Sequence, residues 1–237
     1  LMPEDFFRQG KLEMATEAFQ AGPQVMLWGD CLANRIAVVA LLLLMLIELA
    51  DFLRTVPKIW DCVQMWRANI GLEHSISTAR SRNNAAITVA LGWILVADRY
   101  GIYPAAWIDS LAYGWSAAAL LGVVIAYLLL RRIALLLCAP KRMHGDDLQA
   151  LHKAMFTYFI PSGLIMMLTA GAMSVAGCRD ALVCMVLQYE LLVFWLFAII
   201  RTAQILSSKQ SILATILYLC GLEFLPAGAV VATAVLL

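Results

Sequence analysis

The sequence predicts an all-α membrane protein: a polytopic helical bundle of about six transmembrane helices, with one further amphipathic helix on the cytoplasmic surface. Of the 237 residues, 63% are hydrophobic and only 14% are charged, whereas a soluble domain carries about 25% charged residues. Mean hydropathy is +0.83. Several apolar stretches also exceed the roughly 18 residues that mark a spanning helix. So few polar side chains could not cover this chain in water, and we expect the lipid bilayer to surround it.

The apolar stretches predict six spans, at about 36–54, 84–99, 111–137, 154–176, 181–206 and 212–236. The second is short, because Asp98 and Arg99 close it after about fifteen residues. A re-entrant or tilted segment is the alternative there. We expect residues 1–34 to form an amphipathic N-terminal segment and residues 35–237 to form the transmembrane bundle.

Charge is distributed unevenly between the two sides of the predicted bundle. Basic residues lie around the connections after spans one, three and five: Arg54, Lys58, Arg67, Arg80, Arg82, Arg131, Arg132, Lys141, Arg142, Lys153, Arg201 and Lys209. The N-terminal segment is instead acidic, with Glu4, Asp5, Glu13, Glu17 and Asp30. Cytoplasmic loops carry the excess of Lys and Arg. This pattern predicts basic loops in the cytoplasm and both termini outside, in the periplasm if the membrane is a bacterial inner membrane.

Residues 57–71 have the pattern of a separate surface helix. Ile59, Trp60, Val63, Trp66 and Ile70 recur at helical spacing, with polar residues between them. Such a stripe with tryptophan anchors is typical of an amphipathic helix lying on the membrane surface.

Two carboxylates, Glu190 and Glu223, are predicted to lie nearest the membrane midplane. A carboxylate at this depth is costly and marks a candidate functional position. Glu190 shares a stripe of its helix with Arg201 and Gln204, because helical residues advance by about 100° each. The same residue types could form a water-filled proton path, polar contacts between helices, or contacts to a partner subunit.

Four further charged residues are predicted in the inner half of the membrane: Arg131, Arg201, Glu48 and Asp51. Because a buried charge needs a partner, we expect Arg201 or Arg131 to pair with Glu48 or Asp51. Arg131 and Arg132 could alternatively extend to lipid headgroups.

Two prolines predict helix breaks inside spans. Pro161 removes the helix hydrogen bond to the carbonyl of Thr157, and Pro226 removes the bond to Leu222. Freed carbonyls near a carboxylate can coordinate a cation, as in transporters with broken helices. They also occur in ordinary spanning helices.

Composition and motifs argue against several functions. The net charge of +1 gives no electrostatic basis for binding nucleic acid. The three histidines lie in polar segments, and no standard metal, phosphate-loop or hydrolase motif occurs. The six cysteines contain no C-x-x-C pair and are expected to be packing residues. We therefore expect no cofactor, no metal and no enzymatic activity.

The second half of the chain resembles a family of Bacteroidota inner-membrane proteins known as domain of unknown function 4271. The resemblance is carried by residues 201–206 (RTAQIL) and by Tyr218-Leu219-Cys220 with Glu223 and Pro226. Ile160-Pro161 and Arg131-Arg132 support it, and it covers roughly residues 105–237. It implies a Gram-negative inner membrane and a six-helix bundle, and it implies no activity.

Two functions remain open at this stage. The first is a non-enzymatic structural or accessory subunit of a cell-envelope assembly, with other membrane or periplasmic subunits, or further copies of the chain, as partners. The second is a small transporter or lipid flippase in which Glu190 and Glu223 couple movement to protons or cations. The first is preferred because it requires fewer features that the sequence does not display.

Overall fold

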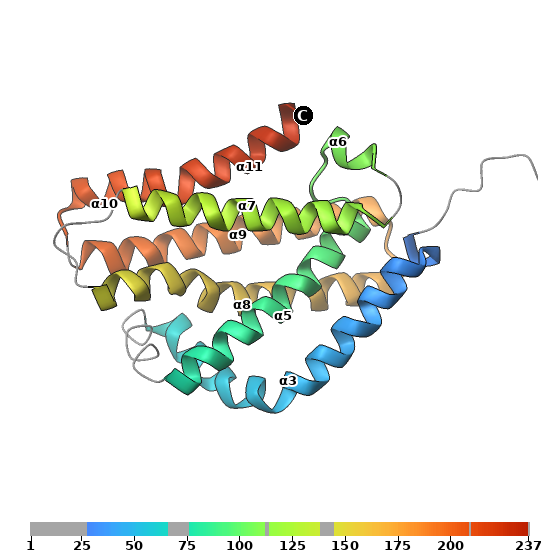
Figure 1. Cartoon of the computed structure of the whole chain (residues 1–237), viewed down its shortest axis with the longest axis horizontal. Helices are drawn as coiled ribbons and strands as arrows, with labels where there is room; N and C mark the ends of the chain where they lie inside the picture. Colours follow the sequence, from blue (N-terminus) through green and yellow to red (C-terminus); the bar gives the residue numbers. More distant parts are fainter. Residues whose placement is uncertain (1–27, 66–75, 112–113, 138–144, 209, 237) are drawn as a thin grey trace, which may run out of the picture.

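The computed structural model describes residues 28–65, 76–111, 114–137, 145–208 and 210–236, and nearly all of them are helical. About 90% of the structure is helix, and these described segments contain no strand. In chain order the elements are η1 (Trp28–Asp30), α3 (Leu32–Gln64), α5 (Ile76–Tyr100), α6 (Ala106–Asp109), α7 (Ser116–Leu137), α8 (Gly145–Val175), α9 (Asp180–Ser207), α10 (Ile212–Leu219), the π-helical turn η2 (Cys220–Phe224) and α11 (Leu225–Leu236). Figure 1 shows them as one helical bundle, which confirms the predicted fold class.

Within the described segments, five helical stretches are long and apolar enough to cross a membrane: α3, α7, the part of α8 from Lys153, α9, and α10 through α11. They correspond to five of the six predicted spans. The remaining predicted span, the second (about 84–99), corresponds to α5. This is a continuous helix of 25 residues, so it is roughly 37 Å long. It begins at Ile76 rather than near residue 84, and its polar first half keeps it outside the apolar set.

The position of α5 explains why a helix with so many polar residues belongs to the bundle. It runs diagonally through the molecule and packs against α3, α7, α8 and α9 (Figure 1). Ala85, Ala86 and Val89 on α5 are buried together with Ile59 of α3 and Ile160 of α8. The surroundings of α5 are therefore mainly protein, and its sequence need not be as apolar as that of a lipid-facing span.

The predicted surface helix over residues 57–71 is wrong in its first half. Residues 57–64 continue α3 without interruption, through Pro57, to Gln64. Ile59 and Cys62 are buried while Trp60 is exposed, so this segment directs its apolar face at the bundle rather than at lipid headgroups. The rest of the predicted helix, and most of the predicted N-terminal segment 1–34, lie outside the described residues.

Two glycines end long helices at the same side of the bundle. Gly101 follows α5 with φ of 61°, and Gly177 follows α8 with φ of 70°. After each, the next N–H bonds back to the helix: Ile102 to the carbonyl of Ala97, and Cys178 to that of Met173, both at 3.0 Å. This is the Schellman arrangement, in which a left-handed residue closes the last turn. The chain after Gly101 then folds inward and buries Ile102, Ala105 and Ile108 in the adjoining core.

Candidate functional site

The most deeply buried charged contact in the described chain joins Arg131 of α7 to Glu223 of η2. Nη2 of Arg131 donates to Oε1 of Glu223 at 2.6 Å, and the two side chains are only 2% and 4% exposed. Both residues were candidates from the sequence, but the expected pairing of Arg131 or Arg201 with Glu48 or Asp51 is wrong. Burial at membrane depth makes each partner depend on the other, because either charge alone would be costly there.

The π-helical turn η2 places Glu223 toward α7. Pro226 has no N–H, so the carbonyl of Leu222 cannot receive the usual helix bond. The N–H of Leu225 bonds instead to the carbonyl of Cys220, five residues back. Such a wide turn inserts one extra residue and is often found at functional positions. Here it leaves Leu222 and Glu223 buried and Cys220 exposed.

The other predicted break does not interrupt its helix. Residues around Pro161 remain α-helical throughout α8. The hydroxyl of Ser162 bonds to the carbonyl of Phe159 at 2.8 Å. The hydroxyl of Thr157 bonds to the carbonyl of Lys153 at 3.4 Å. Pro161 therefore leaves α8 continuous, and the predicted break at this position is wrong.

Arg201 hydrogen-bonds to the C-terminal end of α3 and not, as predicted, to a carboxylate. Its Nη2 donates to the carbonyl of Val63 at 2.6 Å and to that of Gln64 at 3.3 Å. Nη1 donates to Oε1 of Gln204 at 2.9 Å, and the guanidinium lies 5.2 Å from the ring centre of Phe197. The last carbonyls of a helix are free acceptors at the negative end of its dipole, so a guanidinium there stabilises the helix end and links α9 to α3.

Glu48 and Asp51, both on α3, have different environments. Oε2 of Glu48 accepts a hydrogen bond from the hydroxyl of Thr88 on α5 at 2.6 Å. Asp51 is exposed and faces away from the bundle. Of the two carboxylates predicted in the inner half of this span, Glu48 therefore contacts another helix, whereas Asp51 does not.

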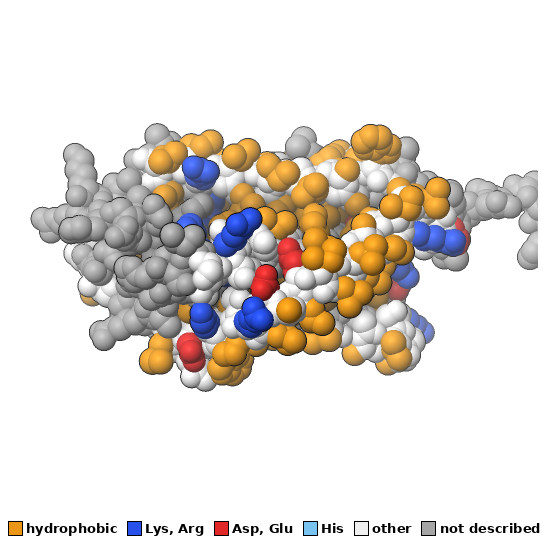
Figure 2. Space-filling model, turned by 60° about the horizontal axis from the view of Figure 1, so that its bottom comes forward, with side chains coloured by type: hydrophobic (Ala, Val, Ile, Leu, Met, Phe, Trp, Pro, Cys, Tyr) orange, Lys and Arg blue, Asp and Glu red, His pale blue; other side chains and the backbone are white. Residues whose placement is uncertain are grey.

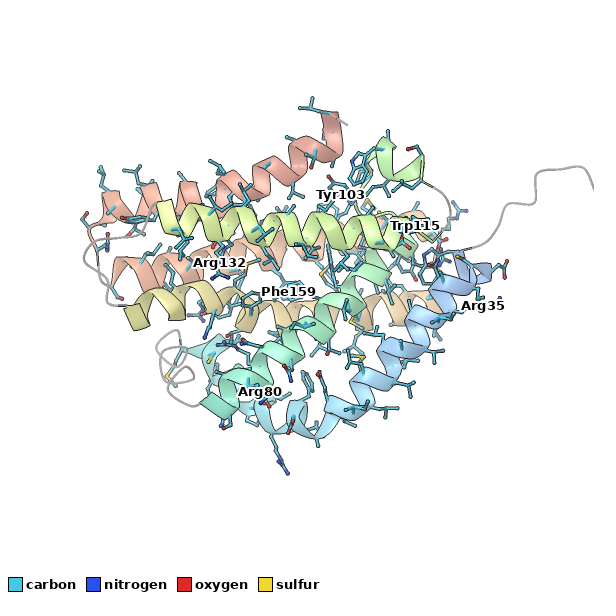
Figure 3. The ribbon with its side chains drawn as sticks, in the orientation of Figure 1. Arg35, Arg80, Tyr103, Trp115, Arg132 and Phe159 are labelled. Atoms are coloured by element: carbon cyan, nitrogen blue, oxygen red, sulfur yellow. The ribbon has the colours of Figure 1, made fainter. Side chains whose placement is uncertain are left out.

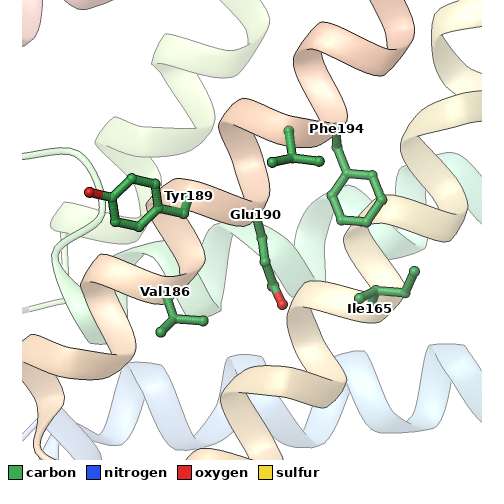
Figure 4. A pocket seen from close by; sticks show the side chains of 6 residues that line it. Ile165, Val186, Tyr189, Glu190 and Phe194 are labelled. Carbon is green, nitrogen blue, oxygen red and sulfur yellow. The ribbon is translucent and has the colours of Figure 1, made fainter.

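Glu190 is one of six residues that line a hollow between α8 and α9 (Figure 4). Its Oε1 accepts from the hydroxyl of Thr169 on α8 at 2.8 Å. Its Oε2 is buried and has no hydrogen-bond partner among the described residues. Glu190 and Glu223, considered together in the sequence, therefore differ: Glu223 has a charged partner, whereas Glu190 has one buried oxygen without a partner in the described part of the chain.

Arg82 is a polar core residue that the sequence analysis assigned to a cytoplasmic loop. It lies on α5, is 1% exposed, and its Nη2 donates to Oδ1 of Asn83 at 2.9 Å. A signal for its burial was present, because positions 82, 85, 86 and 89 recur at the spacing of one helix face. Nearby, Nζ of Lys58 on α3 donates to the hydroxyl of Thr78 on α5 at 2.8 Å.

Polar contacts also join the helices at the end of the bundle where α3 begins and α5 ends. The hydroxyl of Tyr103, labelled in Figure 3, forms a 2.7 Å hydrogen bond with that of Thr233 on α11. Nε1 of Trp28 donates to Oδ2 of Asp98 at 2.6 Å. Each contact joins segments far apart in the sequence, as interhelical hydrogen bonds do in membrane bundles.

No family model matches the chain, and no curated protein or solved structure is significantly similar to it. The resemblance to the Bacteroidota family therefore remains a prediction. In the described part of the chain, no group of three or more His, Cys, Asp and Glu side chains is placed to hold a metal ion. What these side chains can do is hold helices together, with Glu190 able to accept one more hydrogen bond.

Proposed function

We propose that this protein is a non-enzymatic structural or accessory subunit of a larger membrane assembly, and that α3 carries the contact to its partner. The observation that carries the proposal is the exposure of α3. Its most apolar window of 18 residues contains no buried residue, while the corresponding windows of the other four spans are 11–33% buried. Ile47 of this helix is 79% exposed.

The exposed carboxylate of Asp51 suggests that a protein, and not lipid alone, covers this face of α3. It precedes the end of α3 at Gln64 by thirteen residues, which is roughly 20 Å of helix. A carboxylate directed outward from an apolar helix is costly in hydrocarbon. Figure 2 shows acidic and basic side chains grouped within this face, with hydrophobic ones beside them. A partner that presents a hydrogen-bond donor would satisfy Asp51 and cover the apolar surface around it.

The internal polar groups support a structural rather than a catalytic role. Arg131, Arg201 and Glu48 are each engaged with another helix, through Glu223, the carbonyls of α3 and Thr88 respectively. Contacts of this kind stabilise helix association by about 0.6–1.7 kcal/mol each. They leave these candidates engaged in packing rather than directed at a substrate.

The proposed location is the inner membrane of a Gram-negative cell, as the family resemblance implies. Figure 1 places the start of α3 and the C-terminus at one end of the bundle. Exposed Lys58, Arg80 and Arg132 belong to helix segments toward the other end (Figure 3 labels Arg80 and Arg132). The positive-inside rule then favours that end as cytoplasmic and the termini as periplasmic.

The test is purification of the tagged protein from native membranes in mild detergent, with subunit ratios determined by mass spectrometry. We expect at least one other membrane or periplasmic protein at a fixed ratio, and loss of it when Ile47 is replaced by tryptophan. A Leu168→Trp variant is the matched control, because Leu168 is a similarly exposed residue (72%) on α8. Recovery of the chain alone, or only with further copies of itself, would contradict the proposal.

A second candidate, a small transporter or lipid flippase, is favoured by one observation: Oε2 of Glu190 is buried and has no hydrogen-bond partner among the described residues. It predicts that the purified protein in liposomes moves a solute or lipid, and that Glu190→Gln abolishes this movement at unchanged abundance. Glu48→Gln is the matched control, since Glu48 is also an intramembrane carboxylate that accepts from a threonine. Liposomes that remain inactive with the wild-type protein would exclude this candidate.

A further inference from the structure

The hollow around Glu190 has a definite chemical character. Its volume is about 310 Å³, and it is lined by Ile165 of α8 and by Val186, Tyr189, Glu190, Val193 and Phe194 of α9. Ligand sites in proteins are typically apolar concavities of about 300–1,000 Å³ with a few placed polar groups. Glu190 contributes a carboxylate, and Tyr189 carries a hydroxyl that points away from it in Figure 4. The remaining side chains of the lining are aliphatic or aromatic.

The hollow opens to the side of the bundle at membrane depth. Ile165, Tyr189 and Val193 at its edge are 44%, 64% and 62% exposed. Glu190 follows the start of α9 at Asp180 by ten residues, which is roughly 15 Å along the helix. Figure 4 shows its side chain extending from α9 toward α8, between Val186 and Ile165. A molecule dissolved in the bilayer could enter without crossing the protein.

The hydrogen bonding of Glu190 restricts which ligands the hollow can bind. Thr169 already satisfies Oε1, while Oε2 is buried with no partner in the described segments. In the ionised form Oε2 accepts a hydrogen bond, and in the protonated form it can donate one. A hydroxyl group serves both forms, because it donates and accepts. An ammonium group would serve only the ionised form, and a ketone only the protonated one.

We propose that this hollow binds a membrane-soluble alcohol, whose apolar body lies against α8 and α9. Its hydroxyl hydrogen-bonds to the carboxyl group of Glu190 once rotation of that side chain brings the buried, unpartnered Oε2 to the hollow. The site is independent of the proposed subunit role, since it lies between α8 and α9 rather than on α3. A buried polar atom left without a partner is costly, so the hydroxyl group of the ligand should contribute substantially to binding.

The test uses two photoactivatable probes that differ only in one hydroxyl: a long-chain diazirine alcohol and the matching diazirine alkane. The purified protein in lipid nanodiscs is labelled with each, and the adducts are located by peptide mass spectrometry. We expect the alcohol to label the peptides that line the hollow roughly tenfold more than the alkane, as one hydrogen bond to the carboxyl group implies. Glu190→Leu should bring this ratio close to one.

Two further variants keep the result interpretable if Glu190→Leu fails to fold. Val186→Trp fills the hollow and should remove labelling by both probes. Leu192→Trp changes an exposed residue of the same helix that does not line the hollow, and should leave the ratio unchanged. Equal labelling by the two probes in the wild-type protein, or alcohol labelling that survives Val186→Trp, would overturn the proposal.

Discussion

Replacement of Glu223 by alanine is expected to lower the free energy of unfolding by about 3–5 kcal/mol, the usual effect of removing one member of a buried ion pair. The variant deprives Arg131 of a carboxylate at 2.6 Å in a setting where both side chains are almost fully buried. The stability measurement is unfolding of the purified protein in mixed micelles of increasing denaturing detergent, and membrane abundance should fall in parallel.

The matched control is Cys220→Ala, because Cys220 belongs to the same π-helical turn and is exposed. It should leave stability within about 0.5 kcal/mol of the wild-type value. The double variant Arg131→Ala with Glu223→Ala should be less destabilised than the sum of the single variants, since the two residues interact. Additive effects of the two substitutions would contradict the pairing.

Replacement of Gly163 by alanine is expected to destabilise the protein by about 1–3 kcal/mol, as overpacking of a tight core does. A Cβ at Gly163 would overlap Cγ1 of Val89, a branched side chain with little freedom to move. At this position α8 packs tightly against α5, and small residues let membrane helices meet at such points. The same detergent unfolding assay measures the effect.

Gly171→Ala on the same helix is the control, because a Cβ there meets no atom within 4 Å. That variant should be neutral or slightly stabilising, since alanine favours helix over glycine by about 1 kcal/mol. Val89→Ala should recover part of the stability lost in Gly163→Ala by removing the overlapping methyl groups. If Gly163→Ala and Gly171→Ala behave alike, the packing described for α5 and α8 is wrong.

The helical bundle could be predicted from the sequence because long apolar stretches in a chain with few charges have few other solutions. The start of α5 could not be predicted in the same way. Its first turns contain Ser77, Arg80 and Arg82, a composition typical of a loop. The helical spacing of Arg82 with Ala85, Ala86 and Val89 indicates that they share a face, but only the surrounding helices decide that this face is buried.

The partners of the charged residues could also not be predicted from the sequence. Pairing depends on which helices are neighbours, and six similar apolar spans do not specify this. The π-helical turn adds a further obstacle, because one inserted residue rotates Glu223 relative to a regular helix. The identities of the candidates were nevertheless useful: Arg131, Glu223, Arg201 and Glu48 all form contacts between helices.

The most direct test of the proposed subunit role is photocrosslinking from α3 in intact cells. A photoreactive amino acid is placed at Ile47, and in a parallel strain at Leu168 of α8, which is similarly exposed. We predict that position 47 crosslinks to one other protein of defined mass, and that position 168 does not crosslink to it. Crosslinks from position 47 to lipid alone, or to the same proteins as from position 168, would contradict the role proposed for α3.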